Sequence, residues 1–230
     1  MAHADGGFVV SGRSVSVKAP DGTTTVLLEA AADEQFFNDI SADGRRRLFA
    51  CSVPRPSGSS SAAAGRLYLI ELDGSATVLA DDMLISNGIG VDPVGRLPYH
   101  VDSERRTVWR FDLDAADLAG SRRPLVDTSE YGALPDGLAV AADGSVWVAL
   151  AGAGLVVGWD ADGARAAEIG VPHALVTSVC FGGPGLATLY ILTGADAGHP
   201  NPDGGSVFRL DAPWTGFPAP VARVRPPAGD

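Results

Sequence analysis

The sequence repeats a short motif, an aspartate shortly before a glycine, at intervals of about 50 residues. The motif occurs as Asp43-Gly44, Asp92-Pro93-Val94-Gly95 and Asp143-Gly144, and an apolar segment follows each copy. The glycines lie 51 and 49 residues apart. Repetition at about 40 to 50 residues is typical of β-propeller blades, each of which holds about four antiparallel strands. The repeat therefore predicts an all-β fold of the propeller type.

The apolar residues support this prediction, because they come in short segments bounded by glycine, aspartate and proline. Residues 66–71, 107–112 and 145–149 are examples. We expect a single domain over residues 1–230. Its predicted units are a partial blade at about 7–29, followed by four blades at about 34–81, 82–131, 132–172 and 173–225.

This count is four blades and a fraction. A propeller closes when its last blade packs against its first, so a missing unit leaves apolar sheet faces uncovered. The alternatives are a partner chain that covers the open side, such as a second copy in a homo-oligomer, a tight irregular ring, or an incomplete chain.

Charge and cysteine content limit the partners of the chain. It carries 17 Lys and Arg against 28 Asp and Glu, a formal net charge of -11 at pH 7, which argues against nucleic-acid and membrane partners. No basic segment followed by an apolar one opens the sequence, so we expect no signal peptide and a cytoplasmic protein. Cys51 and Cys180 lie far apart and outside any C-x-x-C pattern, which argues against a disulfide framework or a thiolate zinc site.

Three polar side chains follow the same repeat. Asn38, Asn87 and Asp136 are each 49 residues apart, and each precedes a short apolar strand and then the aspartate-glycine turn. In a propeller, this position lies at the start of the innermost strand, near the mouth of the central channel. Converging carboxamide and carboxylate oxygens form a site for a hard divalent cation. The alternative is that Asn87-Gly88 and Asp136-Gly137 are ordinary turn dipeptides.

Six motifs that surround these residues occur in order along the chain. They are Phe37-Asn38-Asp39, Ser86-Asn87-Gly88-Ile89, Val101-Asp102-Ser103, Pro135-Asp136-Gly137-Leu138, Val146-Trp147-Val148-Ala149 and Thr177-Ser178-Val179-Cys180-Phe181-Gly182-Gly183. Together they resemble the family of senescence marker protein, gluconolactonase and luciferin-regenerating enzyme over about residues 6–210. The resemblance implies a six-bladed propeller, a divalent metal ion (Ca²⁺, Zn²⁺, Mn²⁺ or Mg²⁺) in the channel, and hydrolysis of small lactones. It also implies that Asn87 and Asp136 are metal ligands and that Asn38 lies near metal and substrate.

The sequence departs from the family pattern in two places. Family members begin with one further blade, which carries a glutamate ligand that has no counterpart here. Glu29, Glu34 and Asp39 are the candidates for a replacement. Sugar-lactone members often have an arginine two residues before the first asparagine, where this chain has Phe36. A more apolar lactone or ester is then easier to accommodate than a polyhydroxy one.

The function that these observations predict is metal-dependent hydrolysis of a small lactone. Asn87 and Asp136 bind the cation, Asp136 is also the candidate general base, and Asn38 orients the water or the substrate carbonyl. His100, on a predicted strand, is interpreted as a core or channel-wall residue, with a catalytic base as the alternative. The alternative function is a non-catalytic propeller that binds a metal or small ligand.

Overall fold

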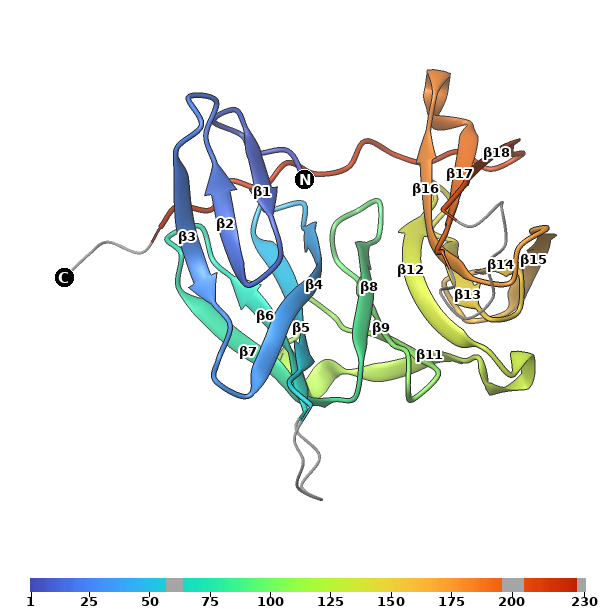
Figure 1. Cartoon of the computed structure of the whole chain (residues 1–230), viewed down its shortest axis with the longest axis horizontal. Helices are drawn as coiled ribbons and strands as arrows, with labels where there is room; N and C mark the ends of the chain where they lie inside the picture. Colours follow the sequence, from blue (N-terminus) through green and yellow to red (C-terminus); the bar gives the residue numbers. More distant parts are fainter. Residues whose placement is uncertain (57–63, 196–204, 227–230) are drawn as a thin grey trace.

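The computed structural model describes residues 1–56, 64–195 and 205–226, which form five antiparallel sheets (Figure 1). The all-β fold that the sequence predicts is therefore confirmed. Helical structure in the described residues is confined to short 3-10 turns at Ala119–Ser121, Ser129–Tyr131 and Pro184–Leu186. Six blades and a missing first blade stay predictions, and residues 196–204 of the last predicted blade lie outside the described residues.

Each sheet is built from strands that follow one another in the chain. The first holds β1 (Phe8–Val10), β2 (Ser14–Lys18) and β3 (Thr24–Glu29). The second holds β4 (Glu34–Ala42), β5 (Leu48–Pro54), β6 (Gly65–Ile70) and β7 (Ala76–Met83). The third holds β8 (Ser86–Val91), β9 (Pro98–Asp102), β10 (Thr107–Arg110) and β11 (Arg123–Asp127). The fourth holds β12 (Leu134–Val140), β13 (Val146–Ala151), β14 (Leu155–Trp159) and β15 (Arg165–Gly170). The fifth holds β16 (Val176–Gly182), β17 (Thr188–Thr193) and β18 (Val207–Asp211).

The repeated aspartate-glycine motif forms the turn between the first two strands of the second, third and fourth sheets. In each turn the aspartate side chain accepts a backbone N–H further along: Asp43 from Arg47, Asp92 from Arg96 and Asp143 from Ser145. Gly95 and Gly144 take positive φ angles of 72° and 88°, a conformation that glycine adopts without strain. The repeated sequence motif therefore corresponds to a repeated turn, in which the aspartate side chain accepts a backbone N–H group.

The apolar core lies between neighbouring sheets rather than within one central layer. Four clusters of buried side chains fill the four successive interfaces. Phe37, Phe49, Tyr99 and Trp147, one from each cluster, are almost completely buried. The first strands of successive sheets, β4, β8, β12 and β16, contact one another in that order and form the inner wall of the assembly. We call them the inner strands.

Residues 212–226, which we call the C-terminal strap, leave the fifth sheet after Asp211 and cross to the first two sheets (Figure 1). Near the fifth sheet, the N–H of Gly216 donates to the carbonyl of Leu186. Further along, Ala222 exchanges backbone hydrogen bonds with the N-terminal residues, and Arg223 donates to the carbonyl of Arg46. Ala222 and Val224 are buried in the cluster between the first two sheets. The strap thus joins the last sheet to the first two.

The outermost sheets of the chain carry exposed apolar side chains. Phe8 on β1 is 58% exposed and Val207 on β18 is 64% exposed. Single exposed apolar residues are common on protein surfaces, so the uncovered side stays a prediction. A second copy of the chain that covers them stays a prediction.

If the strap stabilises the fold through its buried contacts, Val224→Ala will lower the free energy of unfolding by about 2 kcal/mol, because two buried methyl groups are lost and a cavity remains. Val94, which is 74% exposed, supplies the matched control, and Val94→Ala is expected to change stability by less than about 0.5 kcal/mol. Urea unfolding measures both. Equal stabilities for the two variants would mean that the strap does not dock in solution.

Candidate functional site

Each of the four inner strands contains a β-bulge, which lies near the start of β8, β12 and β16 and in the middle of β4. In β4, Asn38 is the extra residue, because Phe37 and Asp39 pair with the consecutive residues Ser52 and Cys51. In β8, Asn87 and Gly88 together oppose one residue of β9. In β12, Asp136 and Gly137 oppose one residue of β13, and in β16 the extra residue is Thr177. A bulge interrupts the pairing and redirects side chains, and bulges are frequent beside active sites.

The bulges account for the equal spacing of the three predicted site residues. Asn38, Asn87 and Asp136 occupy equivalent bulges in successive inner strands, so one structural position recurs in each sheet. Thr177 is the fourth member of this set. Its distance of 41 residues from Asp136 departs from the repeat, so spacing alone did not reveal it.

The glycines that follow Asn87 and Asp136 allow the inner strands to approach closely. A Cβ atom on Gly88 would lie 2.5 Å from the backbone nitrogen of Leu138 and 2.7 Å from the carbonyl oxygen of Asp136. A Cβ atom on Gly137 would lie 2.8 Å from Oγ of Ser178. Since real side chains do not tolerate such distances, only glycine at these positions allows the adjacent bulges to lie so close together. Asn87-Gly88 and Asp136-Gly137 lie within β8 and β12, so they are not turn dipeptides.

Two asparagine side chains of the set are directly hydrogen-bonded. Nδ2 of Asn38 donates to Oδ1 of Asn87 at 3.1 Å and to the carbonyl of Ser86 at 3.0 Å. Nδ2 of Asn87 donates in turn to Oγ of Ser103 at 3.2 Å. Because both amide groups are used as donors, a cation could be bound only by the carboxamide oxygens, of which Oδ1 of Asn87 already accepts one hydrogen bond from Asn38.

Asp136 contributes the negative charge of the set. Burial, followed by the charge of the nearby Asp39, raises its pKa to about 6, while hydrogen bonds with Gly137 and Asn87 act in the opposite direction. Burial also raises the pKa of Asp39, whose oxygens accept the N–H groups of Ile40 and Ile89. A cation bound beside these two carboxylates would stabilise their ionised forms, which burial disfavours.

Of the three candidates for a replacement acidic ligand, only Asp39 acts on Asp136. Glu34 is fully buried and accepts hydrogen bonds from Ser52 and Tyr68. It also pairs with Arg66 at 3.2 Å, so it is part of a structural network within the second sheet. Glu29 is exposed at the end of β3.

The donor chemistry of the set fits a hard divalent cation. Among the described residues, no group of three or more His, Cys, Asp or Glu side chains is placed to hold a metal ion. The candidate site formed by Asn38, Asn87 and Asp136 differs from such a group, because it combines two carboxamides with one carboxylate. Oxygen donors of this type suit Ca²⁺, Mg²⁺ or Mn²⁺ better than Zn²⁺, which prefers nitrogen and sulfur.

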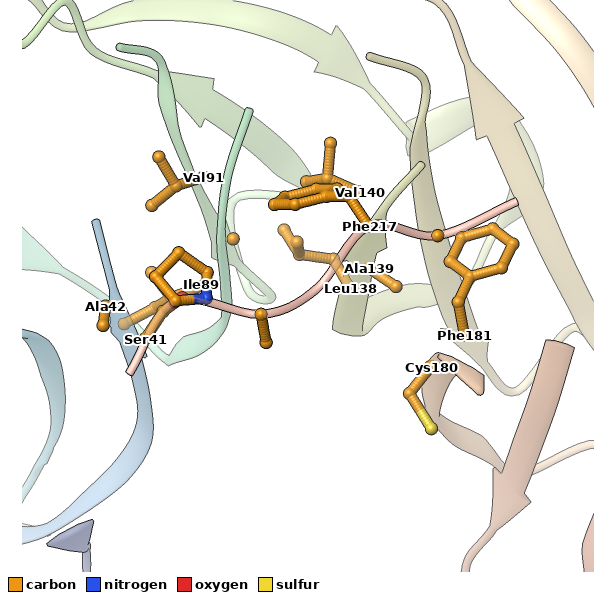
Figure 2. Close-up of a pocket in the computed structure, with 14 residues that line it drawn as sticks. Ser41, Ala42, Ile89, Val91, Leu138, Ala139, Val140, Cys180, Phe181 and Phe217 are labelled. Carbon is orange, nitrogen blue, oxygen red and sulfur yellow. The ribbon is translucent and has the colours of Figure 1, made fainter. Parts of the chain in front are cut away.

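A cavity of about 180 Å³ lies along the same inner strands, toward their C-terminal ends (Figure 2). Side chains of Ile89, Val91, Leu138 and Val140 line it, and Phe217 and Pro220 of the C-terminal strap close part of it. Figure 2 shows Phe217 among the inner-strand side chains. The polar set therefore sits on strands whose other ends carry an apolar lining.

The remaining predicted residues take the following places. Phe36 is half-buried in β4, opposite Val53 and two residues before Asn38. His100 is completely buried in β9, where burial, followed by the charge of Arg122, lowers its pKa to about 3. Its complete burial agrees with its interpretation as a core residue, and a pKa of about 3 makes it a weak base.

Five antiparallel sheets with a polar set on successive inner strands define a propeller-like protein with an oxygen-donor site. Residues 1–195 match the family described as the SMP-30/gluconolactonase/LRE-like region. The chain therefore belongs to this family, as its motifs predict.

Relatives with assigned names include several lactonases. The chain is 38% identical to pentonolactonase XacC of Haloferax volcanii over 199 residues, which is 82% of this chain and 67% of the relative. It is 31% identical to 6-deoxy-6-sulfogluconolactonase of Pseudomonas putida, over 81% of this chain and 65% of the relative. The chain thus spans about two thirds of the length of these relatives.

Solved structures share the fold. Luciferin-regenerating enzyme matches with a TM-score of 0.81 at 24% identity, over 94% of this chain and 78% of that one. A regucalcin from Agrobacterium tumefaciens, described as a calcium-binding protein, also gives a TM-score of 0.81, at 26% identity, over 94% of this chain and 75% of that one. Within the residues that the structure describes, no helix is long and apolar enough to cross a lipid bilayer.

The raised pKa of Asp136 predicts how its charge affects stability. Because the pKa in the folded state is about 6 and the ordinary value is 3.8, the ionised carboxylate destabilises the fold above pH 6, and this cost disappears as the pH falls toward 4. Without divalent cations, Asp136→Asn is therefore expected to raise the melting temperature at pH 7.5 and to leave it nearly unchanged at pH 4.

Asp127→Asn is a control for which the expected change in melting temperature at neutral pH has the opposite sign. Hydrogen bonds from Ser129 lower the pKa of this exposed carboxyl group, so its ionised form stabilises the fold at neutral pH. Thermal unfolding in EDTA at both pH values measures the two variants. A lower melting temperature for Asp136→Asn at pH 7.5 would contradict the electrostatic account of the site.

Proposed function

We propose that the chain is a hydrolase of small lactones that uses a divalent cation. The observation that carries this proposal is the convergence of Asn38, Asn87 and Asp136 on equivalent bulges, with the pKa of Asp136 raised toward neutrality. Relatives named as lactonases support the reaction class. A structural neighbour described as a calcium-binding protein supports the cation.

Asn87 and Asp136 are the residues that would hold the cation, through Oδ1 of Asn87 and a carboxylate oxygen of Asp136. When bound, a divalent cation supplies polarisation of the lactone carbonyl and neutralises the charge that develops on its oxygen. Asp39 lowers the electrostatic potential at the same place, although its oxygens already accept two backbone N–H groups.

Asp136 is also the proposed general base. It takes a proton from the water that attacks the carbonyl carbon, the ring C–O bond breaks, and the departing alkoxide receives a proton to give the hydroxy acid. In protein free of divalent cations, burial and the charge of Asp39 raise the pKa of Asp136 to about 6, so the carboxylate is mostly ionised at neutral pH. Because the Asp136 carboxylate has two oxygens, one could bind the cation while the other accepts the proton.

Asn38 orients the attacking water. Its Nδ2 is committed to the carbonyl of Ser86 and to Oδ1 of Asn87, so its free group is the acceptor Oδ1. An acceptor can hold a water through its O–H but cannot donate to the lactone carbonyl. Of the two roles that the sequence left open for Asn38, the hydrogen-bond pattern supports the one in which it orients water.

The substrate is proposed to be a lactone that is less polar than a sugar lactone. Phe36 offers no hydrogen bond at the position where sugar-lactone members of the family often have arginine. A comparison of γ- and δ-lactones that carry alkyl chains with a polyhydroxy lactone such as gluconolactone tests this preference.

A pH-stat assay over that lactone panel tests the proposed function. We expect hydrolysis with added Ca²⁺, Mn²⁺ or Mg²⁺, complete loss in EDTA, and recovery when the cation is restored. Asp136→Asn is expected to lower the rate by at least about 100-fold, the usual contribution of a general base. Asp127→Asn, at an exposed turn, is expected to retain the parent rate.

Cation binding without turnover of any lactone would instead favour the non-catalytic propeller. If the protein neither binds a cation nor hydrolyses any lactone in a cation-dependent way, both the lactonase and the cation-binding propeller are ruled out.

A further inference from the structure

Ser103 connects two of the bulges that carry the candidate site. It follows β9 in the turn after Asp102 and is only 4% exposed. Its Oγ donates to the carbonyl of Pro135 at 2.6 Å and accepts Nδ2 of Asn87 at 3.2 Å. Pro135 directly precedes Asp136, so one hydroxyl touches the bulge of β8 and the start of the bulge of β12.

The direction of these hydrogen bonds is fixed by their chemistry. The Pro135 carbonyl can only accept, so the single proton of the Ser103 hydroxyl points toward it. The hydroxyl oxygen can then only accept from the Asn87 carboxamide, which must present its NH₂ group to Ser103. Oδ1 of Asn87 is consequently turned toward Asn38, whose Nδ2 donates to it.

The segment before Asn87 is fixed by the neighbouring residue. Asp102 is fully buried, and its carboxylate accepts the N–H groups of Leu84 and Ile85. The N–H of Ser103 donates to the carbonyl of Ile85. The Asp102-Ser103 dipeptide therefore holds both the backbone that leads into β8 and the side chain of Asn87.

We propose that Ser103 is a positioning residue that sets the orientation of the Asn87 carboxamide and keeps its oxygen toward the site. The consequence for cation binding rests on the proposed function, whereas the orientation of Asn87 does not. Without the hydroxyl, Nδ2 of Asn87 loses one of its two acceptors and keeps only the Asp136 carboxylate, so the carboxamide is held less firmly and the position of its oxygen is no longer fixed. Residues that support ligands in this way commonly contribute about 10- to 100-fold to metal affinity.

Three variants separate this role from a general effect on folding. Ser103→Ala removes the hydroxyl, and Ser103→Thr retains it. Ser145→Ala is the matched control, since Ser145 is 3% exposed and its hydroxyl bonds Asp143 and Trp147 in a turn of the fourth sheet. Thermal unfolding of all three identifies any variant that does not fold.

The first measurement is NMR of the Asn87 side-chain amide in protein free of divalent cations, assigned with Asn87→Asp. We expect protected, well-separated NH₂ resonances in the parent, in Ser103→Thr and in Ser145→Ala. In Ser103→Ala we expect faster solvent exchange than in the parent and shifts displaced toward those of a free asparagine. Unchanged Asn87 resonances in folded Ser103→Ala would overturn the proposal.

The second measurement is calorimetric titration with Ca²⁺. We expect Ser103→Ala to bind about 10-fold more weakly than the parent, with Ser103→Thr close to the parent and Ser145→Ala unchanged. Equal affinity of Ser103→Ala and the parent would overturn the link between Ser103 and the cation. If the parent binds no Ca²⁺, the proposed cation site fails, and the NMR measurement still decides the role of Ser103. If Ser103→Ala does not fold, Ser103→Cys, which keeps the size but weakens the donor, replaces it in both measurements, with the same expected direction.

Discussion

The close approach of inner-strand backbones is the constraint on which the candidate site depends. At Gly88 the backbone of β8 comes so near to that of β12 that a Cβ atom would lie within 2.7 Å of the Asp136 carbonyl oxygen. This approach aligns the bulges of neighbouring strands, and the bulges turn Asn38, Asn87 and Asp136 to one side. A polar set that lies far apart in sequence is thereby gathered by main-chain geometry, before any side-chain hydrogen bond contributes.

Bringing these polar side chains together has an electrostatic cost, because it places the Asp136 carboxylate near that of Asp39. Burial and the proximity of Asp39 disfavour the ionised form of Asp136 and raise its pKa. A fold selected only for stability would avoid two carboxylates in one half-buried place, since an apolar or amide side chain there costs less. A bound divalent cation would remove this cost.

Much of this arrangement was accessible from the sequence, and the exceptions have physical reasons. The 49-residue spacing predicted the three site residues because the second, third and fourth sheets repeat the same turn and bulge. Thr177 was missed because its unit is shorter. The role of Ser103 depends on two hydrogen bonds between sheets, which no local pattern encodes. The predicted last blade includes residues 212–225 because nothing in a proline-rich segment indicates that it docks on the first two sheets.

We propose that Asn38, Asn87 and Asp136 surround a common ligand position for a divalent cation. Anomalous diffraction from crystals grown with Mn²⁺ tests it most directly, because the signal locates the ion without reference to activity. The account predicts one strong anomalous peak in contact with Oδ1 of Asn87 and the carboxylate of Asp136, which disappears in Asp136→Asn. Density for an ordered water in place of a peak, or a peak only at surface carboxylates away from the inner strands, would contradict it.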